Sequence, residues 1–190
     1  MKSKDDLLKI RATVLYILNK FPEGVDYIKL FKIIYFAQQR HLSTYGRVII
    51  NETFHAKQHG PVPSFAYNAF LALENKNNHN SDDVQTFISG IEIKNKMVFS
   101  QIVPDLDELS VSDIKCLEYS FEKCKDKKSY QLSKKSHDAA WLSASKSRLV
   151  DPENDRMTIL EIAKADNATD GMLDYIRNMH ILNTSLKGGC

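Results

Sequence analysis

Apolar side chains recur at helical spacing in two stretches at the start of the chain, and Pro22-Glu-Gly24 separates them. The first stretch predicts a helix from Lys4 to Lys20, because its hydrophobic residues collect on one side. Asp26 suits the N-cap of a second helix, since its carboxylate can accept from unpaired N–H groups, and this helix is expected to continue to Ser43. The second helix is apolar on most sides, so we expect it to form the centre of the core.

The segment after this helix has the composition of short strands. Tyr45-Gly46 stops the helix, and Val48–Ile50 and Thr53–Ala56 are enriched in β-branched and aromatic residues. Asn51-Glu52 lies between the two segments and is interpreted as a turn. The pattern therefore predicts a small β-hairpin here.

Two prolines and a third helix follow. Pro61 and Pro63 fix the backbone in an extended conformation. Ser64 or its neighbour then opens a helix that is predicted from Phe65 to Glu74. The asparagine-rich segment 75–83 is expected to be a polar loop.

The pattern changes to alternation between Thr86 and Val103. Apolar residues alternate on both sides of the polar segment Lys94-Asn95-Lys96; they are Ile91, Ile93, Met97 and Phe99. This alternation predicts a second β-hairpin.

The most regular helix of the chain is expected after Ser110. Ser110 and Asp113 have the spacing of a capping box, and apolar residues then follow three, four and three positions apart. Further helices are predicted near 130–134, around Trp141, and over 157–165 and 169–179. We therefore expect a predominantly helical α+β fold, a compact helical core with two small β-hairpins, in which residues 1–186 form a single domain and residues 187–190 a flexible C-terminal tail.

Composition and charge exclude several classes of protein. The 190 residues are 43% hydrophobic and 26% charged, which is typical of soluble globular proteins. A net charge of +2 is too small to demand nucleic acid or an anionic membrane as a partner. The sequence contains no apolar run near the roughly 20 residues that span a bilayer, so no membrane partner is expected.

Cysteine usage indicates the compartment. Cys116, Cys124 and Cys190 form no CxxC pair. The first two lie eight residues apart on a predicted helix, where a disulfide would distort the helix. Free thiols are typical of a reducing environment, so a cytoplasmic location is predicted.

Candidate chemistry is sparse. His55 and His59 lie four residues apart, but with His41 or His137 they lack the ligand spacing of a metal site, and no metal or other cofactor is expected. The chain has neither a GxSxG elbow nor a glycine-rich phosphate loop. His137 and Asp138 are sequence neighbours, which on a helix point about 100° apart rather than toward each other. We therefore predict that the protein is not an enzyme.

Trp141 lies four residues after His137. If Ser136 caps the helix that holds them, the imidazole and the indole meet on one face and pack together. A single tryptophan is more often a core or joining residue than a contact residue, although exposed aromatic residues dominate binding hot spots.

Two segments carry opposite charge. Lys123 to Lys135 contains six lysines and one aspartate, a local charge of +5, and is the best candidate for nucleic-acid contact. It has no arginine to read bases and only Tyr130 to stack on them, so such contact would be non-specific. Asp105 to Asp113 contains four acids and no base and can pair with a basic partner.

Several motifs together resemble one family. They are Tyr16-Ile-Leu18, Lys29-Leu30, Ile34-Tyr35-Phe36-Ala37-Gln38, Tyr45-Gly46, Ala56 and His59-Gly60-Pro61-Val62-Pro63. These motifs resemble the Panacea domain, also called the SocA-like antitoxin domain or DUF4065. The similarity continues through Asp105–Asp113, Leu132, His137 and Trp141, and so covers nearly the whole chain.

The resemblance implies an antitoxin of a bacterial or phage toxin-antitoxin system, which neutralises a cognate protein toxin by direct binding. It also implies a second partner, a protease such as a Clp-type machine, to which the toxin is delivered. On this basis the expected partner-binding residues are Lys57, His59, Pro61, Pro63, Phe65 and Tyr67. The expected structural motif consists of Tyr35, Phe36, Gly60, His137 and Trp141. The alternative is a nucleic-acid-associated regulator that uses the Lys123–Lys135 face, recognisable by steep salt dependence.

Overall fold

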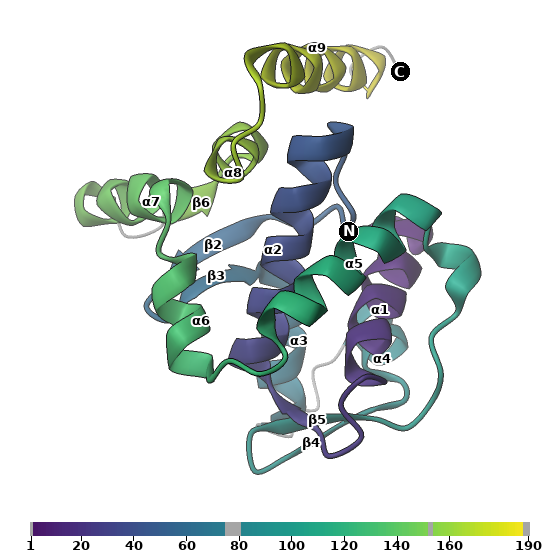
Figure 1. Ribbon diagram of the computed structural model, residues 1–190. Helices are drawn as coiled ribbons and strands as arrows, with labels where there is room; N and C mark the ends of the chain where they lie inside the picture. Colours follow the sequence, from purple (N-terminus) through teal and green to yellow (C-terminus); the bar gives the residue numbers. More distant parts are fainter. Residues whose placement is uncertain (1, 75–80, 152–153, 188–190) are drawn as a thin grey trace.

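The computed structural model describes residues 2–74, 81–151 and 154–187. Helices dominate these residues, so the predicted helix-rich α+β class is confirmed (Figure 1). The helices are α1 (Lys4–Leu18), α2 (Tyr27–Tyr45), α3 (Ser64–Glu74), α4 (Asp82–Ile88), η1 (Leu106–Glu108, 3₁₀), α5 (Val111–Cys124), α6 (Ser129–Ser136), α7 (Ala139–Val150), α8 (Ile159–Ala165) and α9 (Asp170–Lys187). The strands are β1 (Val25–Asp26), β2 (Phe54–Lys57), β3 (Gly60–Pro63), β4 (Ile91–Lys94), β5 (Met97–Ser100) and β6 (Arg156–Met157). Most of the expected polar loop over 75–83 and of the expected tail over 187–190 lies outside the described residues.

Helix α2 lies at the centre of the fold, as predicted. Asp26 caps it by accepting a hydrogen bond from the Lys29 backbone N–H at 3.0 Å, and Gly46 ends it in the left-handed conformation with φ 67°. It packs against α1, α5, α6, α8 and β3 (Figure 1). An apolar pattern on most sides of a helix therefore does correspond here to neighbours on most sides.

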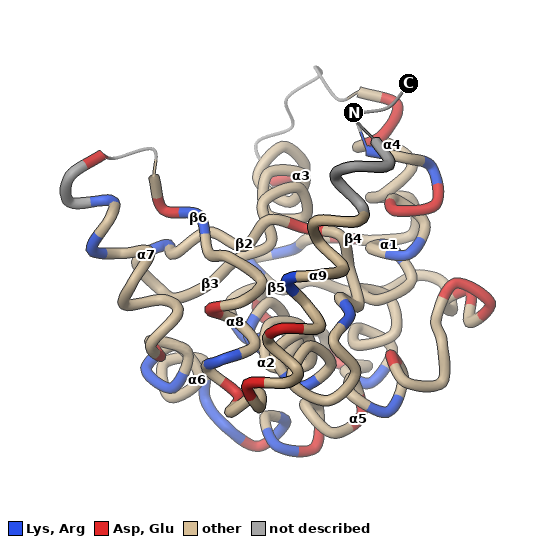
Figure 2. The backbone as a smooth tube through the Cα atoms, turned by 90° about the horizontal axis from the view of Figure 1, so that it is seen from above, with Lys and Arg blue, Asp and Glu red and all other residues tan. Residues whose placement is uncertain are grey.

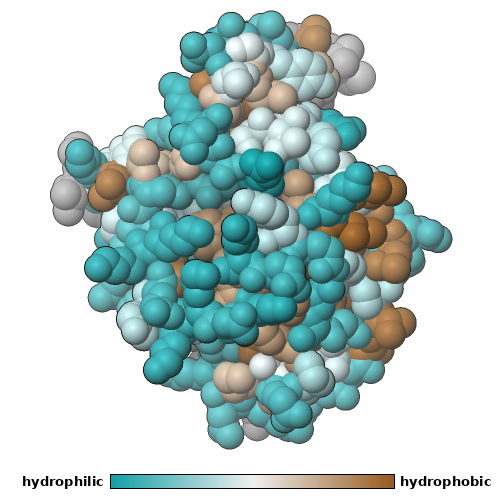
Figure 3. Space-filling view, in the orientation of Figure 1, coloured by the Kyte–Doolittle hydropathy of each residue, from teal (hydrophilic) through white to brown (hydrophobic). Residues whose placement is uncertain are grey.

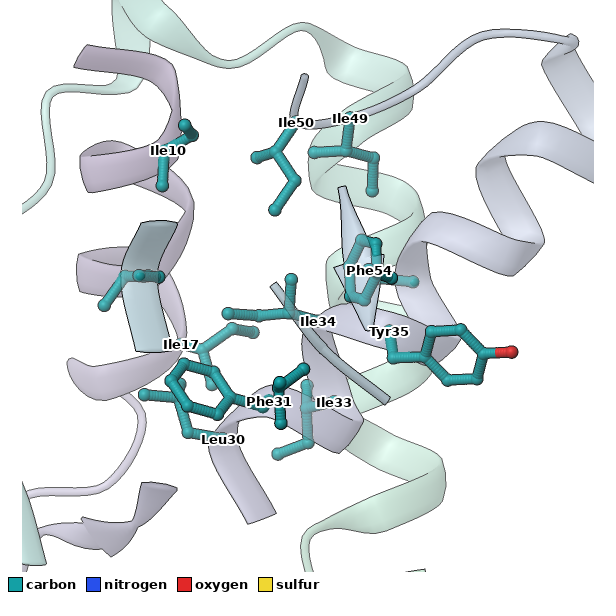
Figure 4. Packing of buried hydrophobic residues seen from close by; sticks show 14 of the residues in the cluster. Ile10, Ile17, Leu30, Phe31, Ile33, Ile34, Tyr35, Ile49, Ile50 and Phe54 are labelled. Atoms are coloured by element: carbon teal, nitrogen blue, oxygen red, sulfur yellow. The ribbon is translucent and has the colours of Figure 1, made fainter. Parts of the chain in front are cut away.

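The hydrophobic core fills the space between α1, α2 and β2. Figure 4 shows Ile10 and Ile17 of α1 facing α2, with Ile49, Ile50 and Phe54 closing the cluster. Burial of each such side chain stabilises the fold by about 1.5–3 kcal/mol. The hydroxyl of Tyr35 points away from the aliphatic cluster.

The first predicted hairpin is wrong in its position. The observed hairpin pairs β2 with β3 in antiparallel register around Gln58-His59, whereas residues 48–50 form no strand. The Gln38 side-chain oxygen accepts from the backbone N–H groups of Ile49 and Ile50 at 2.9 and 3.2 Å, and its amide nitrogen donates to the Ile50 carbonyl. A buried side chain thus satisfies backbone groups that a strand partner would otherwise bind.

Glu52 has a role that also differs from the predicted turn. Its carboxylate accepts from the Phe65 backbone N–H at 2.8 Å, at the start of α3, and pairs with Lys2 Nζ at 2.6 Å. Glu52 therefore caps α3, a helix whose predicted bounds are confirmed.

The second hairpin is confirmed. Strands β4 and β5 pair across Asn95 and Lys96, which both have positive φ as a tight two-residue turn requires. Each hairpin gains a two-residue third strand that the sequence did not predict, giving the sheets β1-β5-β4 and β3-β2-β6. Helix α4 was also not predicted, because its seven residues are too short to show helical periodicity clearly.

The helices of the second half follow the predicted order, with two corrections. Met157 pairs in β6, so α8 begins only at Ile159, and α9 continues to Lys187 rather than ending at 179. Ser110 and Asp113 form the expected capping box of α5. Asp138, rather than the predicted Ser136, caps α7, and its carboxylate accepts from the Trp141 backbone N–H at 3.1 Å. Ser136 instead ends α6.

Candidate functional site

The turn between β2 and β3 is pressed closely against α2 and α6. Gly60 has φ 95°, and a Cβ there would lie 2.2 Å from Ser136 Oγ and 2.7 Å from Lys32 Cε. Only glycine combines this backbone conformation with such a close approach. We call the residues that meet here, Lys32, Gly60, Pro61, Ser136 and His137, the Gly60 junction.

Lys32 is the unusual member of the junction. Its side chain is fully buried, and its Nζ donates a hydrogen bond to the Pro61 carbonyl oxygen at 2.7 Å. Burial lowers the pKa of Lys32 to about 7, an effect that the negative charge of Asp26 partly opposes. Within the described part of the chain, no carboxylate forms an ion pair with Lys32.

His137 and Trp141 hold the turn from the other side. Their rings stack with centroids 3.8 Å apart and planes 11° apart, so the predicted packing of this pair is confirmed. The Trp141 indole N–H donates to the Lys57 carbonyl at 2.9 Å. Burial and the nearby charge of Lys32 lower the pKa of His137. Trp141 thus joins α7 to the β2–β3 turn.

A second polar network fixes α2 to the start of α7. The Tyr35 hydroxyl donates to Asp138 Oδ2 at 2.9 Å, and the Gln39 amide donates to both Tyr35 and Asp138. Burial, followed by the charge of Asp138, raises the pKa of Tyr35 above its usual range. Next to this network, the half-buried ring of Phe36 lies 5.0 Å from Lys135 Nζ.

A cavity of about 510 Å³ opens beside the Gly60 junction. One wall is aromatic and is formed by Tyr27, Phe31 and Tyr67. The lining also includes basic side chains, namely Lys32, Lys57, His59, Lys96 and Arg148. Among the described residues that line the cavity, Asp26 is the single acid. An aromatic wall combined with an excess of positive charge suits an acidic group attached to an apolar one.

His59 borders this cavity and a second hollow. The second hollow, of about 480 Å³, is lined by residues of α6 and by Ile28 and His137. Ser133 Oγ donates to the His59 backbone carbonyl at 2.9 Å and so holds the turn against α6. The exposed His59 side chain borders both the cavity and the second hollow.

The predicted partner-binding residues occupy different environments. Lys57, His59 and Tyr67 line the cavity. Lys57 is also paired with Asp155 at 2.7 Å. Pro61 and Pro63 are buried in β3, and Phe65 is half-buried against Phe87 with ring centroids 5.4 Å apart.

Sequence reasoning missed Lys32. The available signal was a single charged residue inside the otherwise apolar run Leu30–Ala37 of the central helix. Such a residue has no exposed face to occupy, and its burial follows from the position.

The groups considered for catalysis or metal binding lie apart. The His55 ring pairs with Asp155 at 2.5 Å, whereas His137 is stacked on Trp141. Across residues 2–74, 81–151 and 154–187, no group of three or more His, Cys, Asp or Glu residues is placed to hold a metal ion. Burial raises the pKa of the Cys116 thiol to about 11, which disfavours the reactive thiolate.

The fold and the cavity define a helix-dominated α+β protein with a cavity lined by aromatic and basic residues. Residues 30–142 match the family described as Antitoxin SocA-like, Panacea domain, and the chain belongs to this family. The match begins in α2 and ends in α7, so it includes the whole Gly60 junction and leaves out α8 and α9. Comparisons with curated proteins and with solved structures gave no match. None of the described helices has the length and apolar character needed to cross a membrane.

Proposed function

We propose that this protein is an antitoxin that neutralises a cognate protein toxin by direct binding. The observation that carries the proposal is its membership in the SocA-like antitoxin family, over a segment that contains the Gly60 junction and most of the residues lining the cavity. The proposed contact surface is the mouth of this cavity, around His59 and Tyr67.

The chemistry of this surface supports a protein partner. Tyrosine anchors are common at the centres of protein interfaces, and Tyr67 is half-buried with its ring 6.3 Å from that of Phe31. His59 and Lys96 are exposed at the cavity and supply the polar, charged rim that interfaces require. The aromatic wall is already packed in the free protein, so little side-chain entropy is lost on binding.

The test is co-expression with the products of the genes adjacent to its own. Neutralisation predicts that one such product stops growth when expressed alone, and that co-expression restores growth and yields a complex that co-purifies. Repeating the experiment in cells without Clp proteases separates neutralisation by binding from delivery to a protease. If no adjacent product is toxic and none binds, the antitoxin role is wrong.

Two variants test the contact surface. His59→Glu introduces a negative charge at the rim and Tyr67→Ala removes the anchor, and each is expected to weaken the complex by about tenfold or more. Matched controls lie on α5, where Lys115 and Tyr119 are exposed outside the cavity. Lys115→Glu and Tyr119→Ala should bind as wild type. Equal affinity for all four variants would place the contact elsewhere on the molecule.

The Lys123–Lys135 face supports a second candidate function, contact with nucleic acid. Figure 2 shows basic segments along α5 and α6 interrupted by acidic ones. Several lysines already have internal partners: Lys125 pairs with Glu122 at 2.7 Å, and Lys127 donates to the Lys123 carbonyl. If this face binds nucleic acid, affinity should fall steeply between low and moderate salt, because phosphate contacts release counterions.

A further inference from the structure

The hydrogen bond that Lys32 makes in the folded chain does not require a charged donor. The single hydrogen bond to the Pro61 carbonyl uses one of three ammonium protons, and a neutral donor could make the same bond. Burying a charge without a partner is costly, and replacing such a group by an apolar one is often neutral or stabilising. The position of the ammonium is therefore better explained by a partner group that the isolated chain does not supply.

Asp26 is not that partner group, because it forms no ion pair with Lys32. Asp26 is the acid whose charge acts on Lys32, but its Oδ1 accepts from the Lys29 backbone N–H at 3.0 Å. Its Oδ2 accepts from Ser129 Oγ at 2.5 Å. Both carboxylate oxygens of Asp26 are thus committed to holding α2 and α6.

The cavity has the features of a site for a carboxylate. Lys32 is among the lining residues together with Phe31 and Tyr67, and both Lys32 and Phe31 are 0% exposed in the free protein. A carboxylate carried on an apolar group therefore contacts the ammonium only when the lining side chains move apart beside the aromatic rings. Arg148 and Lys57, also in the lining, have internal partners in Ala56 O at 3.3 Å and Asp155 at 2.7 Å. Lys32 is the fully buried cation of the lining, and a buried ion pair gains more Coulomb energy than an exposed one.

We propose that this cavity receives an acidic side chain of the bound toxin, and that its carboxylate pairs with Lys32 while its neighbouring apolar atoms pack on Phe31 and Tyr67. The inference rests on the proposed function only in that the toxin supplies the side chain. The receptor site itself belongs to this chain and can be tested alone.

The first test uses end-blocked tripeptides and the free protein at pH 6, where the peptide glutamate is ionised and Lys32 is protonated. Acetyl-Phe-Glu-Phe-amide and acetyl-Phe-Gln-Phe-amide differ only in the charge of the central residue. We expect the Glu peptide, at millimolar concentration, to shift the NMR signals of the Gly60 amide and the Lys32 side chain, and to bind at least fivefold more tightly than the Gln peptide. Equal binding of the two peptides, or binding of neither, overturns the proposal. This comparison needs only the wild-type protein.

Two further probes test the residue and the source of the carboxylate. Lys32→Met should abolish the preference for the Glu peptide, whereas Lys115→Met, the same change at an exposed position of α5, should retain it. Acetyl-Phe-Gln-Phe with a free C-terminus offers a terminal carboxylate instead of a side chain. If this third peptide alone binds, an acidic side chain is the wrong occupant and the proposal fails.

The complex with the toxin separates the two proposals. Lys32→Met should weaken that complex at least tenfold, and changing one toxin Asp or Glu to its amide should cause no additional loss in the Lys32→Met background. Unchanged affinity of Lys32→Met in a complex that still neutralises the toxin overturns the carboxylate site and leaves the antitoxin function intact. If no toxin is bound at all, the proposed function fails while the peptide result still decides what the cavity accepts.

Discussion

Helices α2 and α9 are nearly equal in length, with 19 and 18 residues, and both carry apolar residues at helical spacing. Yet α2 is enclosed by the rest of the fold, whereas α9 rests on the end of α2 and on α8 at the periphery (Figure 1). The outer part of α9 leaves large apolar side chains exposed, namely Tyr175, Met179, Ile181 and Leu182. An amphipathic pattern thus predicts a helix, but its neighbours decide how deeply it is buried.

The exposed apolar residues are not confined to α9. Three of them, Ile102, Val103 and Leu106, lie in the connection between β5 and α5, and a fourth, Val111, begins α5. Figure 3 shows hydrophobic patches at the right edge of the molecule, where this connection runs in the same view of Figure 1. The face over α5 and α6 is mainly hydrophilic by contrast.

The sharpest test of the comparison between α2 and α9 is one substitution made in both helices. Leu30 of α2 is 0% exposed and Leu182 of α9 is 55% exposed. Leu30→Ala should lower the free energy of unfolding by about 3–5 kcal/mol, because it leaves a cavity in the core. Leu182→Ala should change it by less than about 0.5 kcal/mol. Urea denaturation measures both, and similar losses would show that α9 is integrated into the core.

Glycine substitutions provide the next test. Gly60→Ala should destabilise the fold by about 2–4 kcal/mol, because it combines an unfavourable positive φ with overlap against Ser136 and Lys32. Gly171→Ala is the matched control in α9, where a Cβ would meet nothing within 4 Å. It should stabilise the protein by up to about 1 kcal/mol through helix propensity. A tolerated Gly60→Ala would mean that the turn is not held tightly against α2.

The pH dependence of stability gives a smaller but specific effect. The pKa of Lys32 is about 7 in the folded protein and has its ordinary value near 10.4 when the chain unfolds. Between these values the unfolded state binds more protons, so this group makes stability rise with pH, by about 1.4 kcal/mol per unit. Below pH 7 both states are protonated and the slope disappears.

The measurement is the difference between wild type and Lys32→Met in urea denaturation from pH 6 to 9. Wild type should gain stability relative to the variant by about 2–3 kcal/mol between pH 7 and 9. Asp26, whose charge acts on Lys32, is present in both proteins and cancels in the difference to first order. His137 is also present in both, and burial is the largest cause of its lowered pKa, ahead of the charge of Lys32. A flat difference would show that Lys32 keeps its ordinary pKa.

Local signals account for the parts of the fold that were predicted correctly. The caps at Asp26 and Ser110 and the turn at Asn95-Lys96 depend on residues within a few positions of one another. The misplaced hairpin has the opposite cause. Ile49 and Ile50 are buried like strand residues, but Gln38 of α2 occupies their backbone groups, and no local pattern reveals that contact.

For the candidate site, individual residues could be predicted from the sequence but their arrangement in space could not. His59, Gly60, Tyr67, His137 and Trp141 were all selected from the sequence. The predicted stacking of His137 on Trp141 forms, but between the end of α6 and α7 rather than on one face of a single helix. Their convergence around the β2–β3 turn could not be predicted, because it depends on contacts between segments about 80 residues apart, such as Trp141 with Lys57. Lys32 was missed because its burial depends on the β2–β3 turn, which packs against α2 only in the folded protein.

The sequence by itself determined the helices, their caps, the helix-rich α+β class and the resemblance to an antitoxin family, since these follow from periodicity, short-range hydrogen bonds and motif residues. The tertiary structure alone decided which of two similar helices became the core, where the first hairpin formed, and that Lys32 was buried with no acidic partner in the part of the chain that the structure describes. The physical reason is that burial and charge pairing depend on three-dimensional neighbours, and distant segments supply those neighbours.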